Sequence, residues 1–448
     1  MPTAGNSKSL GSLLHNGSGL PAGSLAANIA SIANPQFIGS TAIVILSDST
    51  AIYPTSTTGW AYLLAQDFAS TFSTAAILPR LWNDTNQDYD NFTNLTANEE
   101  RYINISTRDA SARTRISDRT QWGSYTNLDL RVDCAPQTWA PASFAALVGQ
   151  WSGSAGTNGH RLVLRTDGKL ELDFTTDGST TVSALSSVAT GFSANTRKQV
   201  RVTRNATTGA VNFYTRDVGT TAWTQLGSAN VSSTTGTIAS VARDYEVGGH
   251  GNSAVIPGKY YGVEYRADIG DGRIVNPQPI ESWYTNEDLS PILGASTLYM
   301  WIGAKIGADS AYLTDSTRGP KLAPPHQIPV LGMINNGHNE LYTMSFSAFL
   351  TAFDSFKTIL NAQCPGNHTV LMTQNPRSTS TFYAEQQRHR MSWAQVWALK
   401  NNVPIIDVYG AYLKDSAGVA ANLEATGLHP NDAGASLWKT TIRNRLIL

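Results

Sequence analysis

The sequence predicts an α/β domain with a parallel sheet, interrupted along the chain by an all-β sandwich. Strand and helix patterns alternate near the N-terminal end and again from about residue 291, whereas the residues between them alternate with a period of two. A serine follows the first apolar run and a histidine precedes the last helical stretch, so the two outer parts also carry candidate site residues. The chain of 448 residues is too long for one ordinary core, which agrees with several domains.

The composition favours an extracellular β-rich protein. The formal net charge is -1, charged residues make up 15%, and Ser, Thr, Asn and Gly are abundant. No basic stripe is present, so no nucleic-acid partner is expected. No run of about 18 apolar residues occurs, so no membrane span is expected. Cys134 and Cys364 fall in different predicted domains, which argues against a disulfide.

Residues 1–39 predict a flexible or docking arm. They are rich in Gly, Ser, Ala and Asn with scattered Leu. No basic segment leads into an apolar core, so a secretory signal peptide is not expected.

Residues 40–85 predict a strand, a helix and a second strand. The apolar run Thr41–Leu46 predicts a strand with Ser49 at its carboxyl end. Apolar residues at helical spacing predict a helix from Gly59 to Phe72, and Ala76–Trp82 predicts the next strand. Two strands and one helix are too little to bury a sheet, so this piece needs the C-terminal part of the chain.

Residues 86–290 predict an all-β jelly-roll sandwich. Short segments alternate apolar and polar residues, and turn signals such as Asp167-Gly168 separate them. Many short strands at regular spacing are typical of a sandwich or jelly roll. The alternating segments are 128–133, 161–165, 169–174, 199–203 and 210–214.

Residues 291–448 return to alternating strands and helices, which implies a parallel sheet covered on both faces. The predicted elements are strands at 328–334, 368–373 and 403–409 and helices at 345–361, 383–400 and 432–446. An inserted domain costs little closure entropy when its ends lie close together. We therefore expect 40–85 and 291–448 to form one domain that the sandwich interrupts.

The candidate site lies where the strands of this domain end, because catalytic groups in open α/β sheets lie outside the carboxyl ends of the strands. Ser49 needs an adjacent base to act as a nucleophile, and His429 is the candidate. An oxyanion needs preorganised donors. The candidates are the N–H groups of Ser49 and Gly307 and the side-chain amide of Asn339.

These positions resemble the four sequence blocks of the SGNH, or GDSL-type, hydrolase family, in the same order. The matching segments are Ser47-Asp48-Ser49, Gly307, Gly337-His338-Asn339-Glu340 and Thr426-Gly427-Leu428-His429. The resemblance implies a flavodoxin-like three-layer α/β/α domain and ester hydrolysis, commonly deacetylation of carbohydrate or cleavage of lipid esters. It also implies that Ser49, Gly307, Asn339 and His429 are catalytic.

Two residues depart from the family pattern. Ser47 stands where the family has glycine, and Thr426 stands where it has the aspartate of the triad. Threonine cannot carry a negative charge. Glu424 or a backbone carbonyl could orient His429 instead; the alternative is an impaired site that only binds. No cluster of His, Cys, Asp and Glu has metal-ligand spacing, so neither a metal nor another cofactor is expected.

The middle region resembles concanavalin-A-like domains of the laminin-G type, which implies glycan binding. The segments that carry the resemblance include Leu147–Trp151, Gly159–Leu164 and Gly258–Tyr265. Of Trp139, Trp151 and Trp223, most are expected in the sandwich core.

The combination of an esterase domain, a glycan-binding-type sandwich and a small-residue arm resembles minor tail proteins of actinobacteriophages. The resemblance implies a place in the virion tail with extracellular action, and an arm that contacts other tail proteins. It further implies a host cell-surface glycan or lipid ester as partner, with a homotrimer as one option. Two alternatives stay open: a catalytically impaired receptor-binding or structural tail protein, and a secreted bacterial esterase.

Overall fold

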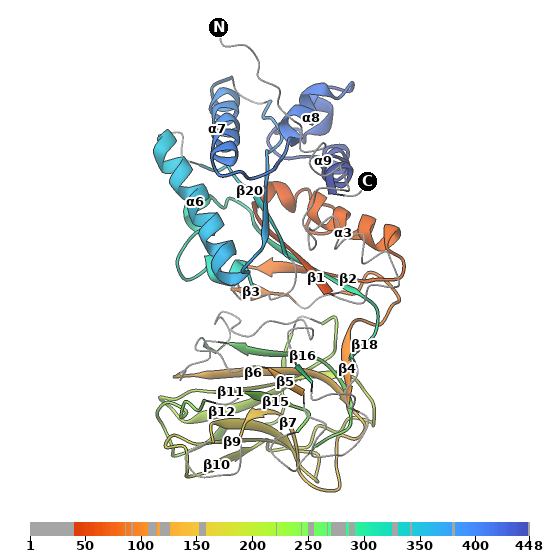
Figure 1. Ribbon diagram of the computed structural model, residues 1–448, viewed down its shortest axis with the longest axis vertical. Coiled ribbons are helices and arrows are strands. Elements are labelled where there is room, and N and C mark those ends of the chain that lie inside the picture. The colour runs from red at the N-terminus through yellow and green to blue at the C-terminus, as the bar shows by residue number, and fades with distance from the viewer. Residues whose placement is uncertain are drawn as a thin grey trace. The chain divides into compact units, whose positions relative to one another are not determined.

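The computed structural model describes the chain from residue 40 to residue 446, with gaps. The residues outside the description are 1–39, 86, 91–92, 106–113, 117–125, 152–157, 221, 243, 250–254, 267, 270–283, 286–291, 325–329, 341–342, 379–380 and 447–448. The predicted N-terminal arm therefore lies outside the described residues. The chain forms two compact units: an α/β unit, Met1–Asn98 with Ser296–Leu448, and a β unit, Glu99–Ala295 (Figure 1).

The α/β unit contains a seven-stranded sheet in the order β22-β21-β20-β1-β19-β2-β3. Its strands are β1 (Ser40–Asp48), β2 (Ala76–Asn83), β3 (Asp88–Tyr89), β19 (Thr297–Lys305), β20 (Val330–Asn335), β21 (His368–Met372) and β22 (Ile405–Ile406). All neighbouring pairs are parallel except β2 and β3. The parallel sheet predicted from the alternating pattern is confirmed.

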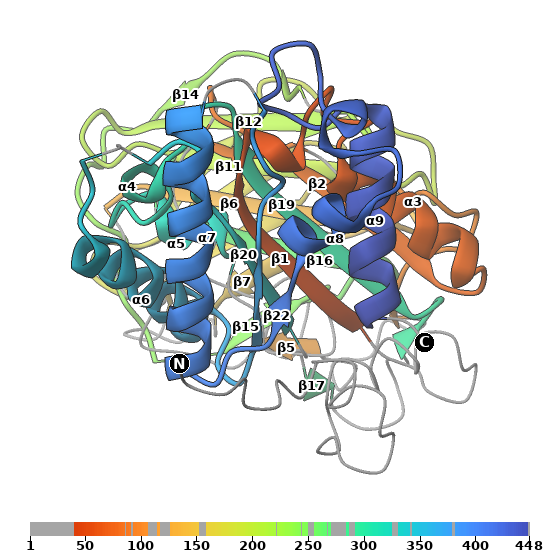
Figure 2. The same cartoon turned by 90° about the horizontal axis from the view of Figure 1, so that it is seen from above.

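Helices cover both faces of this sheet (Figure 2). The helices α3 (Trp60–Thr71), α8 (Val408–Lys414) and α9 (Asp432–Leu446) lie on one face, and α6 (Phe346–Gln363) and α7 (Thr381–Lys400) lie on the other. Two short helices, α4 (Ser310–Leu313) and α5 (Gly319–Leu322), follow β19.

The side chains of the parallel strands point alternately to these two helix layers. Ile43 and Ile45 belong to the core cluster that also contains the buried residues of α3 and α9, where Trp60 stacks on Trp438 with ring centroids 5.5 Å apart. On the other face, α6 approaches β20 closely at Gly332: a Cβ atom there would lie 2.7 Å from Leu360 Cδ1. The absence of a side chain at Gly332 therefore lets α6 pack on the sheet.

The inner strand β19 was not among the elements predicted from the sequence. It lies between β1 and β2 and pairs in parallel with both. Its run from Leu298 to Ile302 is buried on both faces, as is usual for a central parallel strand. The predicted strand 403–409 is shorter, because Asp407 caps α8 by accepting a hydrogen bond from Gly410 N, so that the helix begins at Val408.

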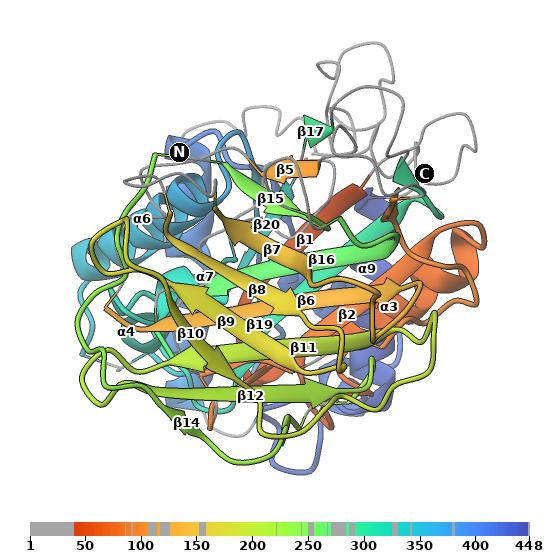
Figure 3. The ribbon, with the colours of Figure 1, turned by 90° about the horizontal axis from the view of Figure 1, so that it is seen from below.

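The β unit consists of antiparallel strands in two sheets, of orders β10-β9-β8-β7-β15-β5-β17 and β13-β12-β11-β6-β16-β4-β18 (Figure 3). The first sheet holds β5 (Thr114–Ile116), β7 (Ala145–Gln150), β8 (His160–Leu164), β9 (Leu170–Phe174), β10 (Val182–Leu185), β15 (Tyr245–Val247) and β17 (Tyr284–Thr285). The second holds β4 (Tyr102–Ile105), β6 (Leu128–Pro136), β11 (Lys198–Arg204), β12 (Ala210–Arg216), β13 (Thr224–Gln225), β16 (Gly258–Arg266) and β18 (Ile292–Leu293), and β14 (Asn230–Val231) pairs with β12. Residues of both sheets share one buried apolar cluster.

The three tryptophans expected in the sandwich core have different surroundings. Trp139 belongs to the shared core cluster. Trp151 is buried but lies outside that cluster, beneath the Arg161 guanidinium, whose carbon is 4.6 Å from the ring centroid. Trp223 is half-buried and has the guanidinium carbon of Arg216 4.1 Å from its ring centroid. Two of the three therefore contact arginine side chains and lie outside the shared core cluster.

None of the described helices combines the length and the apolar character that a membrane-spanning segment requires.

Candidate active site

Three neighbouring parallel strands end at the same edge of the α/β sheet and place the candidate residues there. In the strand pairing, Ser47 of β1 lies beside Ala304 of β19 and Asn335 of β20. Ser49 follows directly, at the start of a short 3-10 turn (Ser49–Ala51) that Asp48 caps by accepting a hydrogen bond from Thr50 N at 3.0 Å. The loop with Gly307 and the loop with Asn339 begin at the ends of β19 and β20.

A chain of hydrogen bonds joins Ser49, His429 and Glu424. Ser49 Oγ lies 2.8 Å from His429 Nε2, although 380 positions separate the two residues in sequence. His429 Nδ1 lies 2.8 Å from Glu424 Oε1. Because an ionised carboxylate can only accept, Nδ1 carries the proton in the neutral ring and Nε2 is left to accept from the serine hydroxyl. This is the hydrogen-bond pattern of a serine nucleophile with its base and orienting acid.

Thr426 does not take the third position of this chain. Its hydroxyl donates a hydrogen bond to Glu424 Oε1, the oxygen that also accepts from His429. Of the two residues considered from the sequence, Glu424 therefore contacts the imidazole, and Thr426 contacts Glu424.

A tight turn brings Glu424 to the histidine that lies five residues later. Glu424 N donates to His429 O at 3.0 Å, and Leu423 and Pro430 form an isolated antiparallel bridge. Gly427, with φ +64°, adopts the left-handed conformation that the turn requires, and its N–H donates to Glu424 O at 2.8 Å. The backbone thus doubles back, and the longer side chain of glutamate reaches the ring.

Tyr53, which the sequence did not indicate, completes the surroundings of the imidazole. Its ring stacks on His429 with centroids 4.1 Å apart and an interplanar angle of 15°. Its hydroxyl also donates a hydrogen bond to Glu424, and this bond raises the pKa of Tyr53. Tyr53 therefore contacts both the base and the acid that orients it.

Glu424 stays ionised over a wide pH range. Its burial alone would raise its pKa, but the hydrogen bonds from Thr426, Tyr53 and His429 outweigh that effect and lower the pKa to about 2. The carboxylate can therefore balance a positive charge on His429 at any pH at which an esterase would work.

Two of the three candidate oxyanion donors, Gly307 and Asn339, lie on loops that are joined by a hydrogen bond. Asn339 Nδ2 donates to Ala308 O at 3.0 Å, which joins the loop after β20 to the loop after β19. Gly307 has φ +76°. Apart from its chain neighbours, no atom lies within 4 Å of the place where a Cβ would stand, so the space beside its Cα is open. Glu340 accepts from Ser310 N at 2.7 Å and from Ser310 Oγ at 3.0 Å, which holds the same two loops together.

The turn that carries Ser49 rests on buried polar groups. Asp48 is fully buried and accepts from Gln374 Nε2 at 2.7 Å and from Thr50 Oγ1 at 2.7 Å. Burial raises the pKa of Asp48, although these hydrogen bonds act in the opposite direction. Ser47, which replaces the glycine of the family pattern, donates to Asn335 Oδ1 at 2.8 Å and so ties β1 to β20.

His338 is a buried structural residue of the loop after β20. Its Nε2 lies 2.9 Å from Asn375 O, and burial, together with the nearby Arg377, lowers its pKa well below the usual value. Arg377 donates to His338 O at 2.7 Å, and Arg390 donates to Gly337 O at 2.8 Å. The neutral ring and the two guanidinium groups fix the loop that carries Asn339.

Within the described part of the chain, no group of three or more His, Cys, Asp or Glu side chains is arranged to hold a metal ion. Cys134 and Cys364 are buried free thiols, one in each unit.

No protein-family model and no curated protein matches the chain. Among solved structures, a peptidoglycan O-acetylesterase resembles it with a TM-score of 0.38 and 8% identity over 94% of both chains. An acetylxylan esterase from Geobacillus stearothermophilus matches with a TM-score of 0.28 and 14% identity over 34% of this chain and 73% of its own. A SAP-like pentraxin from Limulus polyphemus matches with a TM-score of 0.32 and 9% identity over 44% of this chain and 94% of its own. With TM-scores this low, the function has to be inferred from the site itself.

Proposed function

We propose that the α/β unit is a serine carboxylic ester hydrolase of the SGNH type, with Ser49, His429 and Glu424 as its triad. The observation that carries the proposal is the pair of 2.8 Å hydrogen bonds, from Ser49 Oγ to His429 Nε2 and from His429 Nδ1 to Glu424 Oε1. A serine hydroxyl is a weak nucleophile unless a base is in hydrogen-bond reach and is itself oriented by a third group.

In the first half of the proposed reaction, Ser49 Oγ attacks the carbonyl carbon of the ester and gives its proton to His429 Nε2. The electron pair of the carbonyl double bond moves to oxygen and forms a tetrahedral oxyanion. Glu424 stabilises the imidazolium that has formed. His429 then gives the proton to the leaving alkoxide, which departs as an alcohol and leaves an acyl group on Ser49.

In the second half, water attacks the acyl carbonyl while His429 takes one of its protons. When the second tetrahedral intermediate collapses, His429 returns this proton to Ser49 Oγ and the carboxylic acid leaves. The N–H groups of Ser49 and Gly307 and the amide of Asn339 are assigned to hold both oxyanions. The hydrogen bond between Asn339 and Ala308 supports that assignment, because it fixes the amide beside the Gly307 loop.

The decisive experiment measures hydrolysis of a p-nitrophenyl acetate, butyrate and octanoate panel. The purified protein is compared with Ser49→Ala and His429→Ala, and with matched controls at exposed positions of the same unit, Ser56→Ala and His389→Ala. We expect both site variants to fall to background and both controls to keep full turnover. A fluorophosphonate probe, which labels activated serines whatever the natural acyl group, should modify the parent and not Ser49→Ala.

Equal turnover in the parent and both site variants, with no probe labelling of Ser49, would contradict the proposal. That result would favour the catalytically impaired binding protein.

The finer part of the proposal concerns where the esterase acts. We propose that it acts on carbohydrate or lipid esters of a host envelope as part of a phage tail, in contact with other tail proteins through residues 1–39. The resemblance of the sequence to minor tail proteins supports this. Mass spectrometry of purified virions tests it, because a secreted bacterial esterase would be absent from them.

A further inference from the structure

Arg377 borders the two loops that carry Asn339 and His429. Its Nη2 donates at 2.7 Å to the carbonyl oxygen of the residue before Asn339. The next residue, Ser378, donates through its N–H to Gly427 O, two residues before His429, at 3.0 Å. In the proposed reaction the ester lies between the base and the oxyanion donors, so Arg377 is next to the proposed substrate site.

The guanidinium of Arg377 forms no ion pair with a carboxylate in the described part of the chain. It carries five N–H groups, and its hydrogen bond to the backbone uses one of them. Nε is buried and has no partner among the described residues. The charge of Asp48 acts on the guanidinium, but the carboxylate of Asp48 is hydrogen-bonded to Gln374 and Thr50 instead. Arg377 therefore has donors left for a ligand.

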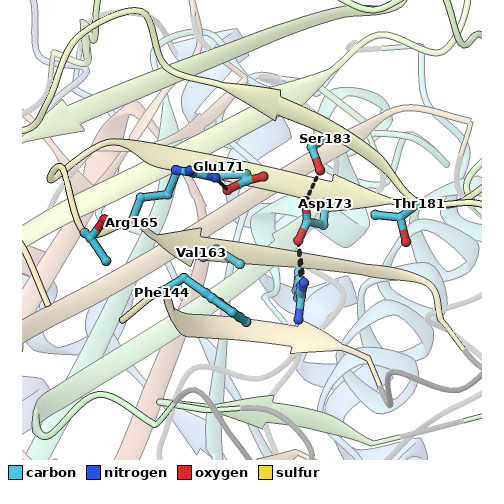
Figure 4. A pocket seen from close by; sticks show the side chains of 9 residues that line it. Phe144, Val163, Arg165, Glu171, Asp173, Thr181 and Ser183 are labelled. Carbon is cyan, nitrogen blue, oxygen red and sulfur yellow. Dashed lines mark hydrogen bonds and ion pairs between the residues drawn. The ribbon is translucent and has the colours of Figure 1, made fainter. Parts of the chain in front are cut away.

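Two arginines of the β unit show how this protein neutralises such a charge elsewhere. They line a pocket of about 310 Å³ on the sheet that contains β7 to β10 (Figure 4). Arg165 Nη1 lies 2.6 Å from Glu171 Oε2. Arg161 Nη2 lies 2.7 Å from Asp173 Oδ2. Each of these arginines meets a carboxylate of β9, whereas Arg377 meets a carbonyl oxygen.

The positive charge of Arg377 is not explained by the contact with the loop. The side chain is half-buried, and burial lowers the pKa of Arg377, because it disfavours the charged form. A neutral amide could donate to the same carbonyl without that cost. The loop is also fixed by Arg390, which is 5% exposed and donates to Gly337 O at 2.8 Å.

Solvent reaches the surroundings of the Arg377 guanidinium. Its central carbon lies 5.9 Å from the ring centroid of Tyr383, a side chain that is 48% exposed. A ligand at the surface can therefore approach Arg377, unlike the buried Arg390.

We propose that Arg377 binds an anionic group, a carboxylate or a phosphate, in the alcohol part of the ester. The planar fork of a guanidinium matches both groups, and such charge-assisted hydrogen bonds are stronger than neutral ones. His429 protonates the leaving alcohol in the proposed reaction, and the segment of Arg377 is bonded to the loop just before His429, through Ser378 to Gly427. The assignment rests on the proposed esterase and names its substrates as acidic esters.

Matched pairs of acetate esters test the proposal with the full chain. The anionic esters are 3-acetoxybenzoate, 4-acetoxybenzoate and 4-acetoxyphenyl phosphate, and the neutral counterparts are their methyl esters. The readout is the ratio of kcat/KM for the anionic ester to kcat/KM for its neutral counterpart. The intrinsic reactivity of the esters cancels when this ratio is compared between variants of the protein.

Three substitutions separate the charge from the structural contact. Arg377→Gln removes the charge and keeps a donor for the carbonyl, and the ratio should fall about tenfold or more for at least one anionic group. Arg377→Lys keeps the charge without the fork, so its ratio should lie in between. Lys400→Gln removes the same charge at an exposed position at the C-terminal end of α7 and should leave the ratio unchanged. A purely structural role of Arg377 would lower kcat/KM for both members of a pair alike.

A measurement on the parent protein needs no variant. Hydrolysis of p-nitrophenyl acetate should be inhibited more strongly by 4-hydroxybenzoate or 4-hydroxyphenyl phosphate than by the neutral methyl 4-hydroxybenzoate. Equal or weaker inhibition by both anions would overturn the proposal.

The kinetic results also separate this proposal from the esterase on which it rests. An unchanged ratio in Arg377→Gln, with the esters still hydrolysed, would overturn the role of Arg377 and leave the esterase in place. No hydrolysis of any ester by the parent, together with no fluorophosphonate labelling of Ser49, would overturn the esterase and the role of Arg377 with it.

Discussion

At the scale of single residues, Glu424 shows how a hydrogen-bond pattern can be kept when a sequence motif changes. The family pattern has an aspartate three residues before the histidine, and this chain has Thr426 there. Glu424, two residues further away and one methylene longer, reaches His429 Nδ1 because the turn at Gly427 folds the backbone back. The threonine then supports the substitute by donating to it.

Removing the charge of Glu424 should lower activity sharply. Glu424→Gln keeps the size of the side chain, but its amide can also donate, which permits the wrong tautomer of His429. We expect kcat to fall by roughly 10⁴, as for the equivalent change in a Ser-His-Asp triad. Thr426→Val should cost far less, because the carboxylate remains. Steady-state kinetics with p-nitrophenyl acetate measures both, and equal losses would show that Thr426 itself orients the histidine.

Tyr53 and Thr426 should hold the Glu424 pKa down. Tyr53→Phe keeps the ring that stacks on His429 and removes the hydrogen bond to the carboxylate, so the Glu424 pKa should rise from about 2 toward its ordinary value of 4.5. NMR titration of ¹³C-labelled glutamate carboxyl groups measures the shift. An unchanged pKa in both Tyr53→Phe and Thr426→Val would contradict this assignment.

The depressed pKa of Glu424 also links stability to acid. A carboxylate whose pKa is lower in the folded state than in the unfolded chain stabilises the fold at pH values above the unfolded pKa. This contribution is lost as the pH falls toward the folded pKa of about 2. Between pH 5 and pH 2 the free energy of unfolding should therefore fall less steeply in Glu424→Gln than in the parent. Urea unfolding at a series of pH values measures the two slopes, with Glu385→Gln, at an exposed helix position, as the control.

At the scale of elements, close packing of α6 on β20 depends on a missing side chain. Gly332→Ala would place a Cβ 2.7 Å from Leu360 Cδ1, and we expect it to lower the free energy of unfolding by about 1–3 kcal/mol. Leu360→Val should relieve part of that crowding, so the double substitution should cost less than the sum of the two single ones. Chemical unfolding of all four proteins measures the coupling, and simple additivity would show that α6 does not press on Gly332.

Elements with a clear period were predictable from the sequence, whereas the order of the strands was not. The amphipathic helices and most parallel strands carry local patterns, and the helix predicted at 345–361 is α6. Strand β19 has no alternation, because both of its faces are buried, although its apolar run Leu298–Ile302 is a signal that could have indicated it. Local patterns also give no sign that β19, which is much later in the chain, lies between β1 and β2 in the sheet.

The site residues divide in the same way. Ser49 and His429 follow motifs with a fixed order, so the sequence could place both at one rim, and the structure brings them within 2.8 Å. Tyr53 and Gln374 reach the site through turns and a neighbouring strand end, and nothing in their local sequence distinguishes them.

At the scale of the whole molecule, the β unit begins and ends at adjacent points. Ala295 N donates to Glu99 O at 2.8 Å, so the first and last residues of the β unit are hydrogen-bonded to each other. On the side of the α/β unit, Asn98 Nδ2 donates to Ala75 O at 2.9 Å and Ser296 O accepts from Ala76 N at 2.8 Å. Both crossing points of the chain are therefore close together within each unit, as a tolerated insertion requires.

Removing the β unit should leave the α/β unit folded. Replacing residues 99–295 by a short Gly-Ser linker would join Asn98 to Ser296 across a distance that the chain already spans. We expect cooperative thermal unfolding and unchanged fluorophosphonate labelling of Ser49 in the shortened protein. The isolated 99–295 segment is the companion protein. Loss of the cooperative transition in the shortened chain would show that the α/β unit depends on the β unit.

The position of β19 between β1 and β2 has a consequence for how the protein is made. When β1 and β2 leave the ribosome, the strand that separates them does not yet exist, and neither does β20 on the other side of β1. At 5–20 residues per second, synthesis of the intervening β unit takes about 10–40 s. During that interval the nascent chain carries two apolar strands with open edges, and the cell has to keep them from pairing with each other or with other chains before the third strand emerges.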